Sequence, residues 1–207
     1  MNTYNAASPE LAAIEISGLT RSSFILKSVL AAGAAYGAGA VAPFVSRAMA
    51  QGGGDVDILN FALTLEYLET DFYVRASKLK LSKDYKGLAK DFGDNELEHV
   101  DALKATIEKL GGKPVAEPSF TFPMKDEKSF VKLAVVLEDT GVSAYNGAAP
   151  AIESKEVLAA AGSIVQVEAR HAATIRLRSG KTPSPDAFDK TLEMQEVLDA
   201  VKPFIKA

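Results

Sequence analysis

The sequence predicts an all-α protein: a four-helix bundle made of two repeated helical hairpins joined by a long crossover, with a further helix at the C-terminus. Three observations predict this fold. Apolar residues recur at the spacing of amphipathic helices, a group of residues recurs after a constant offset, and a proline-rich segment separates the two copies. With 47% apolar and 24% charged residues, the composition fits one well-buried globular domain.

The composition excludes several classes of function. The 207-residue chain has no cysteine, which excludes a disulfide framework, a cysteine-ligated zinc or iron–sulfur site and a thiol nucleophile. Its net charge of −4 comes without a basic stripe or patch, so we expect no nucleic-acid partner.

Residues 1–50 have the composition of an export signal and are set apart from the fold. Arg21 and Lys27 precede an uncharged stretch, 28–46, that is rich in alanine and glycine, and Ala48-Met-Ala50 offers the small residues that a signal peptidase reads. The sequence therefore predicts an exported protein, periplasmic or extracellular. The uncharged stretch is short and glycine-rich, so we expect no stable membrane span once the signal is processed.

The same segment resembles a twin-arginine signal, the type that exports folded, cofactor-loaded proteins, because Arg21, Phe24 and Lys27 precede a weakly hydrophobic core. The second arginine of that signal is missing, since Ser22 follows Arg21. General secretion is therefore an equal alternative. A further alternative is an uncleaved segment that anchors the protein to the membrane.

The chain after the signal consists of two halves related by a repeat without a gap. The residues that recur after 72 positions include Glu66 with Glu138, Tyr73 with Tyr145, Glu96 with Glu168 and His99 with His171. Apolar positions such as Leu65 and Leu137 keep the same offset. We therefore expect two copies of one helical hairpin, near 55–112 and 126–182, within a domain that spans 51–182.

Each copy carries the start and stop signals of two helices. The predicted helices run from Asp57 to about Leu79, from a Ser82 cap to Gly111, from an Asp126 cap to about Ala149, and to Gly180. Both connections within the copies are short, so the two helices of each copy are expected to be antiparallel neighbours.

The segment between the copies is predicted to cross the bundle as extended chain. Residues 112–125 contain Pro114, Pro118 and Pro123, which do not suit a helix interior. A segment of this length spans at most about 46 Å, whereas a helix of about 25 residues is about 37 Å long. Two hairpins joined by one long crossover form the ferritin-like arrangement of a four-helix bundle.

Residues 183–207 are predicted to hold a fifth, amphipathic helix from Asp186 to Phe204. The apolar positions that predict it are Phe188, Leu192, Val197, Leu198 and Val201. Two roles are open to this helix: packing on the bundle, or contact between copies of the chain in a homo-oligomer.

The two histidines of the chain each follow a glutamate by three positions, as Glu96-Leu-Glu-His99 and Glu168-Ala-Arg-His171. This separation on a helix places two side chains about 60° apart on one face, within reach of one ion. Glu98 lies on the other side of its helix and is expected to face solvent. The predicted metal ligands are Glu66, Glu96, His99, Glu138, Glu168 and His171, three from each copy.

The two remaining glutamates of this set, Glu66 and Glu138, lie inside apolar runs of the first and third helices. Four inward carboxylates in a bundle core need compensating charge. Two divalent cations supply it, because four glutamates, two M²⁺ ions and two neutral imidazoles sum to zero. Oxygen and imidazole ligands suit iron or manganese, and zinc fits the same ligand types. We expect one glutamate of each copy to bridge the two ions.

Across residues 55–180 the chain resembles the ferritin-like superfamily. The spacing Glu-x6-Tyr, from Glu66 to Tyr73 and from Glu138 to Tyr145, is similar to that of rubrerythrins. Together with the export signal, it resembles the exported bacterial ferritin-like domain family related to desiccation-associated proteins. The resemblance implies the fold and a di-metal site, but the reactions of that family are largely undefined. The cysteine-ligated iron domain that delivers electrons in full rubrerythrins has no counterpart in these residues.

Three further residues near the predicted centre have two interpretations each. Tyr73 and Tyr145 lie about 10.5 Å along the helix from their glutamates and nearly on the same face. They either assist the metal ligands, by a hydrogen bond or a redox role, or are core tyrosines. Glu69 breaks the repeat because its counterpart is Gly141. It is either a seventh, movable carboxylate, with space opposite for dioxygen, peroxide or a bridging oxygen, or a surface glutamate.

Three functions fit such a chain. The leading hypothesis is a di-iron or di-manganese oxidoreductase acting on Fe²⁺, dioxygen or hydrogen peroxide, as a ferroxidase, peroxidase or catalase-like enzyme. In the oxidation of Fe²⁺ by dioxygen or peroxide, and in the disproportionation of hydrogen peroxide, a substrate itself supplies the electrons, which fits the missing electron-delivering domain. The second hypothesis is a non-catalytic metal-binding protein of stress protection or metal sequestration. The third is a bundle whose carboxylates are protonated or paired and hold no metal.

Overall fold

The computed structural model describes residues 54–206. The export signal predicted for residues 1–50 lies outside the described residues. Within 54–206 the regular elements are helices, and the only strand-like pairing is an isolated bridge between Phe120 and Ile205. This part of the chain contains no helix with the length and apolar character that a membrane crossing needs. The all-α prediction is confirmed.

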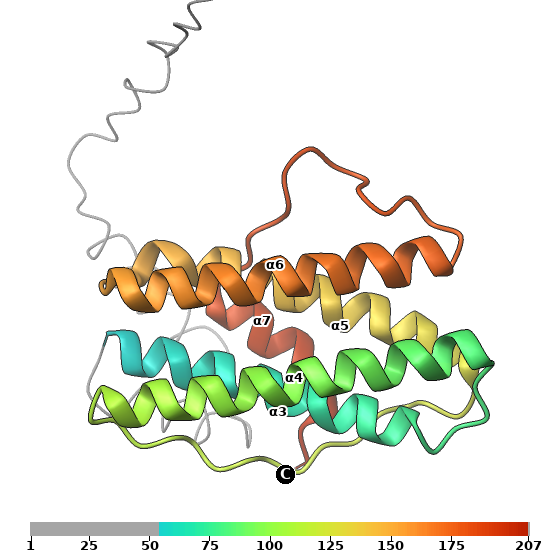
Figure 1. The fold of residues 1–207 in the computed structure, drawn as a ribbon, viewed down its shortest axis with the longest axis horizontal. Coiled ribbons are helices and arrows are strands. Elements are labelled where there is room, and N and C mark those ends of the chain that lie inside the picture. Colours follow the sequence, from blue (N-terminus) through green and yellow to red (C-terminus); the bar gives the residue numbers. More distant parts are fainter. Residues whose placement is uncertain (1–53, 207) are drawn as a thin grey trace, which may run out of the picture. The chain divides into compact units, whose positions relative to one another are not determined.

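Two antiparallel hairpins form the bundle. Helix α3, Asp55–Ala76, packs along α4, Lys83–Lys109, and α5, Glu127–Ala148, packs along α6, Lys155–Arg178. The hairpins meet through contacts of α3 with α5 and of α4 with α6. In Figure 1 the chain leaves the end of α4 and runs along the length of the bundle to the start of α5. The predicted ferritin-like arrangement of two hairpins and a long crossover is therefore confirmed.

The helix boundaries follow the capping residues of the sequence. The carboxylate of Asp126 accepts a hydrogen bond from the backbone N–H of Ser129 at 2.8 Å, and the Ser129 hydroxyl accepts one from the N–H of Asp126 at 3.0 Å. Beyond α4 and α6 the chain turns at Gly111 and Gly180, whose φ angles of 77° and 75° suit glycine. The first predicted helix began and ended too late: α3 runs from Asp55 to Ala76, and Leu79 lies in a tight turn.

The predicted C-terminal helix was also too long. Helix α7 covers only Met194–Val201, followed by the 3₁₀ turn η3, Lys202–Phe204. Residues 186–193 are not helical, because the N–H of Leu192 donates to the carbonyl of Ser143 on α5 and Glu193 forms a new helix cap. Phe188, one of the apolar residues that predicted the longer helix, is 89% exposed.

The C-terminal segment covers the bundle instead of standing apart from it. Helix α7 packs on α5, and the chain after it pairs with the crossover. The N–H of Thr121 donates to the carbonyl of Phe204 at 2.8 Å, and the N–H of Lys206 donates to Ser119 at 2.9 Å. Packing on the bundle is thus observed, whereas a homo-oligomer contact stays a prediction.

The contact between α5 and the segment before α7 generates a stability prediction. A Cβ at Gly147 would lie 2.0 Å from the carbonyl oxygen of Leu192, so Gly147→Ala must displace that segment. We expect a loss of about 1–3 kcal/mol in the free energy of unfolding. Gly162→Ala on α6 is the matched control, because no atom lies within 4 Å of its added Cβ. Urea unfolding of both variants measures the difference, and equal stabilities would contradict the contact.

Candidate metal centre

Six side chains with metal-binding chemistry meet inside the bundle. The four carboxylates of the predicted set are completely buried, with 0% exposure, while His99 is 8% and His171 is 3% exposed. They come from all four bundle helices: Glu66 from α3, Glu96 and His99 from α4, Glu138 from α5, and Glu168 and His171 from α6. The structure therefore brings together every residue that the sequence predicted as a ligand. Glu98 is exposed, as expected.

The donor atoms form two overlapping groups. One contains Glu66, Glu96, His99 and Glu168, and the other contains Glu96, Glu138, Glu168 and His171. Within each group, one donor atom from every residue lies within 4.8 Å of the others. Glu96 and Glu168 belong to both groups, so they are placed to bridge two ions. They come from different copies of the repeat, which fits the predicted bridging pattern.

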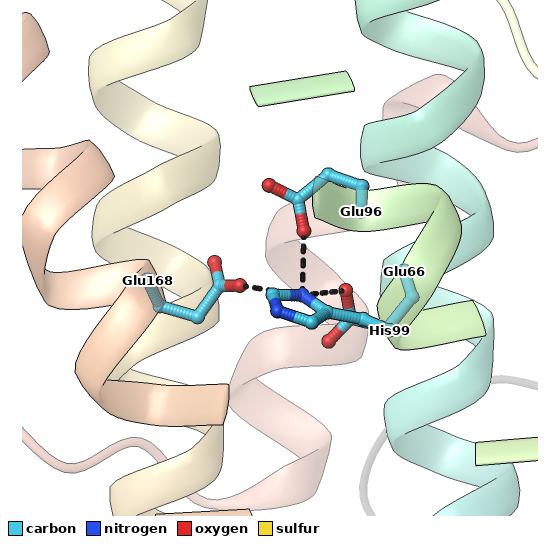
Figure 2. Close-up of side chains that lie close together, drawn as sticks. All are labelled: Glu66, Glu96, His99 and Glu168. Atoms are coloured by element: carbon cyan, nitrogen blue, oxygen red, sulfur yellow. Dashed lines mark hydrogen bonds and ion pairs between the residues drawn. The ribbon is translucent and has the colours of Figure 1, made fainter. Parts of the chain in front are cut away.

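Figure 2 shows the first group around the ring of His99. Nδ1 of this ring lies 2.9 Å from Oε2 of Glu96, 3.2 Å from Oε2 of Glu66 and 3.3 Å from Oε1 of Glu168. In the second group, Nδ1 of His171 lies 2.9 Å from Oε1 of Glu96 and 3.5 Å from Oε2 of Glu138. Both histidines therefore direct the same ring nitrogen towards the carboxylates.

The two tyrosines hydrogen-bond to carboxylates of the opposite copy. The Tyr73 hydroxyl donates to Oε1 of Glu138, and the Tyr145 hydroxyl donates to Oε1 of Glu66. Both rings are buried, at 2% and 7% exposure. Because each tyrosine fixes one carboxylate of the cluster, the interpretation that they assist the proposed ligands describes them better than that of ordinary core tyrosines.

Glu69 also belongs to the centre. Its side chain is 3% exposed, so the surface-glutamate interpretation is wrong. A Cβ at Gly141 would lie 3.0 Å from Oε2 of Glu168 and 3.3 Å from Oε1 of Glu69. The missing side chain at Gly141 therefore provides the space in which these two carboxylates lie.

Among the described residues, the two histidines are the only basic side chains that pair with these carboxylates. Within residues 54–206 no lysine or arginine forms an ion pair with the cluster. Burial raises the pKa of Glu66 to about 7 and also raises the pKa values of Glu69, Glu138 and Glu168. Neighbouring carboxylates add to each increase. Glu96 is the exception: its close contacts with the protonated rings of His171 and His99 outweigh its burial and lower its pKa to about 2.

The histidines hold protons in the metal-free cluster. Burial opposes their charge, but the carboxylates of Glu168, Glu66 and Glu96 around Nδ1 raise the pKa of His99 to about 12. The nearby carboxylates of Glu138 and Glu96 raise the pKa of His171 to about 10. In the absence of metal, imidazolium groups and protonated carboxylates therefore share the charge.

Several donor atoms nevertheless lack a well-directed partner. Among residues 54–206, buried atoms without a hydrogen bond include Oε1 of Glu96, Oε2 of Glu138, both carboxylate oxygens of Glu168 and Nδ1 of His171. Nδ1 of His171 and Oε1 of Glu96 approach to 2.9 Å but lack hydrogen-bond geometry. These atoms are directed at a common interior space, which fits cation ligands better than a set of mutual hydrogen bonds. The residues therefore fit a pair of divalent ions.

The sequence did not single out two neighbours of His171. The Asn95 amide lies 3.0 Å from Nε2 of His171, and the Phe92 ring stacks on the imidazole with centroids 4.0 Å apart. The one feature of the sequence that could have drawn attention to Asn95 is its position directly before the predicted ligand Glu96.

A cleft between α4 and α6 leads to the histidines. It is lined by both of them and by Asp91, Phe92, Asn95, Glu98, Val167, Arg170 and Thr174. The histidine side of the cluster therefore borders a partly polar opening.

Comparison with known proteins gives the family. Residues 54–181 match the family model of the ferritin-like domain, and the chain belongs to this family. Among solved structures, it is similar to a conserved hypothetical protein from Mycobacterium tuberculosis, with a TM-score of 0.56 and 20% identity over 63% of this chain and 94% of that chain. That similarity shows the fold. No curated protein matches the chain.

The pKa shifts generate a prediction about pH. The folded pKa values of Glu66, raised from 4.5 to about 7, and of His171, raised from 6.5 to about 10, mean that the metal-free fold binds more protons than the unfolded chain. The contribution of these groups to stability is therefore lost as pH rises through those windows. Metal ions remove this dependence by replacing the protons.

We therefore expect the difference in Tm between Mn²⁺-loaded and metal-free protein to grow from about pH 5 to about pH 8. Calorimetric scans of the protein with Mn²⁺ or with a chelator measure it. A difference that stays constant or shrinks over this range would contradict the charge state described for the cluster.

Proposed function

We propose that the chain is a di-metal carboxylate oxidoreductase that holds two iron or manganese ions and acts on Fe²⁺, dioxygen or hydrogen peroxide. The observation that carries the proposal is the pair of overlapping donor groups, which share Glu96 and Glu168. A single ion would need only one of these groups. Four completely buried carboxylates, which pair with no lysine or arginine among the described residues, supply the negative charge for two divalent ions.

Each residue of the cluster has a role in this proposal. Glu66 and His99 would hold one ion, Glu138 and His171 would hold the other, and Glu96 and Glu168 are placed to be shared by both. When bound, a pair of redox-active ions would exchange electrons with a small oxidant or reductant. The tyrosine hydroxyls fix the two terminal carboxylates in position, one on each side of the centre.

The surroundings of the centre suit a small substrate. The cleft between α4 and α6 leads past polar side chains such as Asn95 and Thr174 to the histidines, while the carboxylates are shielded from solvent. Burial raises the pKa of Glu69 well above its usual value in the metal-free cluster, and this carboxyl lies beside Glu168 next to Gly141. It is thereby placed to give or accept a proton next to the bridging position.

A second candidate function is metal sequestration or stress protection without turnover. The complete burial of all four proposed carboxylate ligands favours it, because ions held so deeply would exchange slowly. In either case we propose that the protein acts outside the cytoplasm, on the basis of the export-type sequence of residues 1–50.

Metal content tests the ligand assignment. We expect about two ions per chain after loading with Fe²⁺ or Mn²⁺, and His99→Ala or His171→Ala should each reduce this to about one. Glu98→Ala is the matched control, because this glutamate precedes His99 directly but faces solvent. Elemental analysis after gel filtration gives the stoichiometry. Unchanged loading of both histidine variants would show that the assignment is wrong.

Reactivity separates the two candidate functions. Protein loaded anaerobically with Fe²⁺ should oxidise the iron faster than buffer does when dioxygen or hydrogen peroxide is added, and Mn²⁺-loaded protein should be assayed for oxygen release from peroxide. Stopped-flow absorption and an oxygen electrode measure these reactions. A Glu96→Ala, Glu168→Ala double variant should lose the reaction, because both bridging positions are removed. Full loading without turnover of either metal would favour sequestration.

A further inference from the structure

The two copies of the repeat do not surround their histidines equally. Asn95 holds the edge of His171, with its amide 3.0 Å from Nε2. Phe92 stacks on the face of the imidazole, with the ring centroids 4.0 Å apart and an angle of 19° between the ring planes. The hydrogen bond and the stacking fix both the tilt and the rotation of the imidazole.

The corresponding positions near His99 carry no such groups. The offset of the repeat places Val167 at the position of Asn95 and Ile164 at the position of Phe92. Within residues 54–206 no protein group hydrogen-bonds Nε2 of His99, and Val167 lines the same cleft as Asn95. His99 is also the more exposed histidine, at 8% against 3%.

This difference matters because of the nitrogen that each histidine directs at the cluster. Nδ1 of both rings faces the carboxylates, so Nδ1 is the ligand atom in the proposed site and Nε2 carries the remaining proton. The amide oxygen of Asn95 can accept that proton's hydrogen bond, since a half-turn of the amide exchanges its oxygen and nitrogen. A histidine whose second N–H is held in this way is better oriented and more basic as a ligand.

We propose that Asn95 is a positioning residue for His171 and that it makes the two metal positions unequal. The position formed by His171 and Glu138 binds its ion more tightly than the position formed by His99 and Glu66, so the centre loads in two steps. This inference rests on the proposed di-metal function and adds the order of loading to it.

Anaerobic titration calorimetry of Mn²⁺ binding to the metal-free full chain tests the proposal. The wild-type chain should show two steps, of which His171→Ala removes the tighter. Asn95→Leu should weaken the tighter step by about 10- to 100-fold and leave the weaker step in place. Asn95→Asp keeps an acceptor of the same length and should restore the tighter step. Thr174→Val, which removes a hydroxyl from the same cleft, is the control and should leave both steps unchanged.

A substitution that adds an asparagine beside His99 tests the same proposal by a gain of metal affinity instead of a loss. Val167→Asn places next to His99 the same type of residue that Asn95 is for His171. It should raise the affinity of the weaker binding step towards that of the tighter step. Because this variant adds a group, it keeps the proposal falsifiable even if Asn95→Leu does not fold.

A proton readout separates positioning from a general structural role. The chain has only two histidines, so Co²⁺-loaded protein should give two shifted ring N–H signals in NMR spectra. The signal of His171 should exchange more slowly in D₂O than that of His99. Asn95→Leu should remove this protection, and Asn95→Asp should restore it.

The outcomes distinguish the two proposals. A chain that binds no metal contradicts the proposed function. Two equal binding steps in the wild-type chain, or normal stepwise binding and slow exchange in Asn95→Leu, contradict the role of Asn95 and leave the proposed function standing.

Discussion

The structure depends on one electrostatic constraint: five carboxylates lie in the middle of a helical bundle with two imidazoles, and no lysine or arginine among the described residues pairs with them. Such a cluster is costly to bury unless protons or cations reduce its charge. The raised pKa values of Glu66, Glu69, Glu138 and Glu168 express that cost. A pair of divalent cations would relieve it, and the donor atoms already lie close enough together to share such ions.

The duplicated hairpin explains how a short chain builds this centre. Helices α3 and α5 run antiparallel, so the tyrosine near the end of each helix reaches the glutamate in the middle of the other. The long crossover makes this orientation attainable, since it returns the chain to the other end of the bundle before α5 begins. One hairpin alone would hold half of the donors and could not bury them.

The departures from symmetry are as informative as the repeat. Glu69 and Glu168 share the space beside Gly141, which has a glutamate as its counterpart in the first copy. Asn95 and Phe92 hold only one of the two histidines. Both changes act on groups that the repeat itself supplies in pairs. A centre built from two equal halves has thereby become one with two distinct positions and two distinct faces.

The sequence by itself determined the hairpins, the caps at Asp126 and Gly180, and the convergence of the six proposed ligands. Helical periodicity and the constant offset of the repeat can be read directly from the order of the residues, without knowledge of the tertiary contacts. It misjudged the length of the last helix, since the hydrogen bond from Leu192 to Ser143 joins residues far apart in the chain. It left Glu69 undecided and passed over Asn95. Whether Glu69 is buried, and whether Asn95 contacts the ring of His171, depends on which helices pack together. Only the tertiary structure decides this.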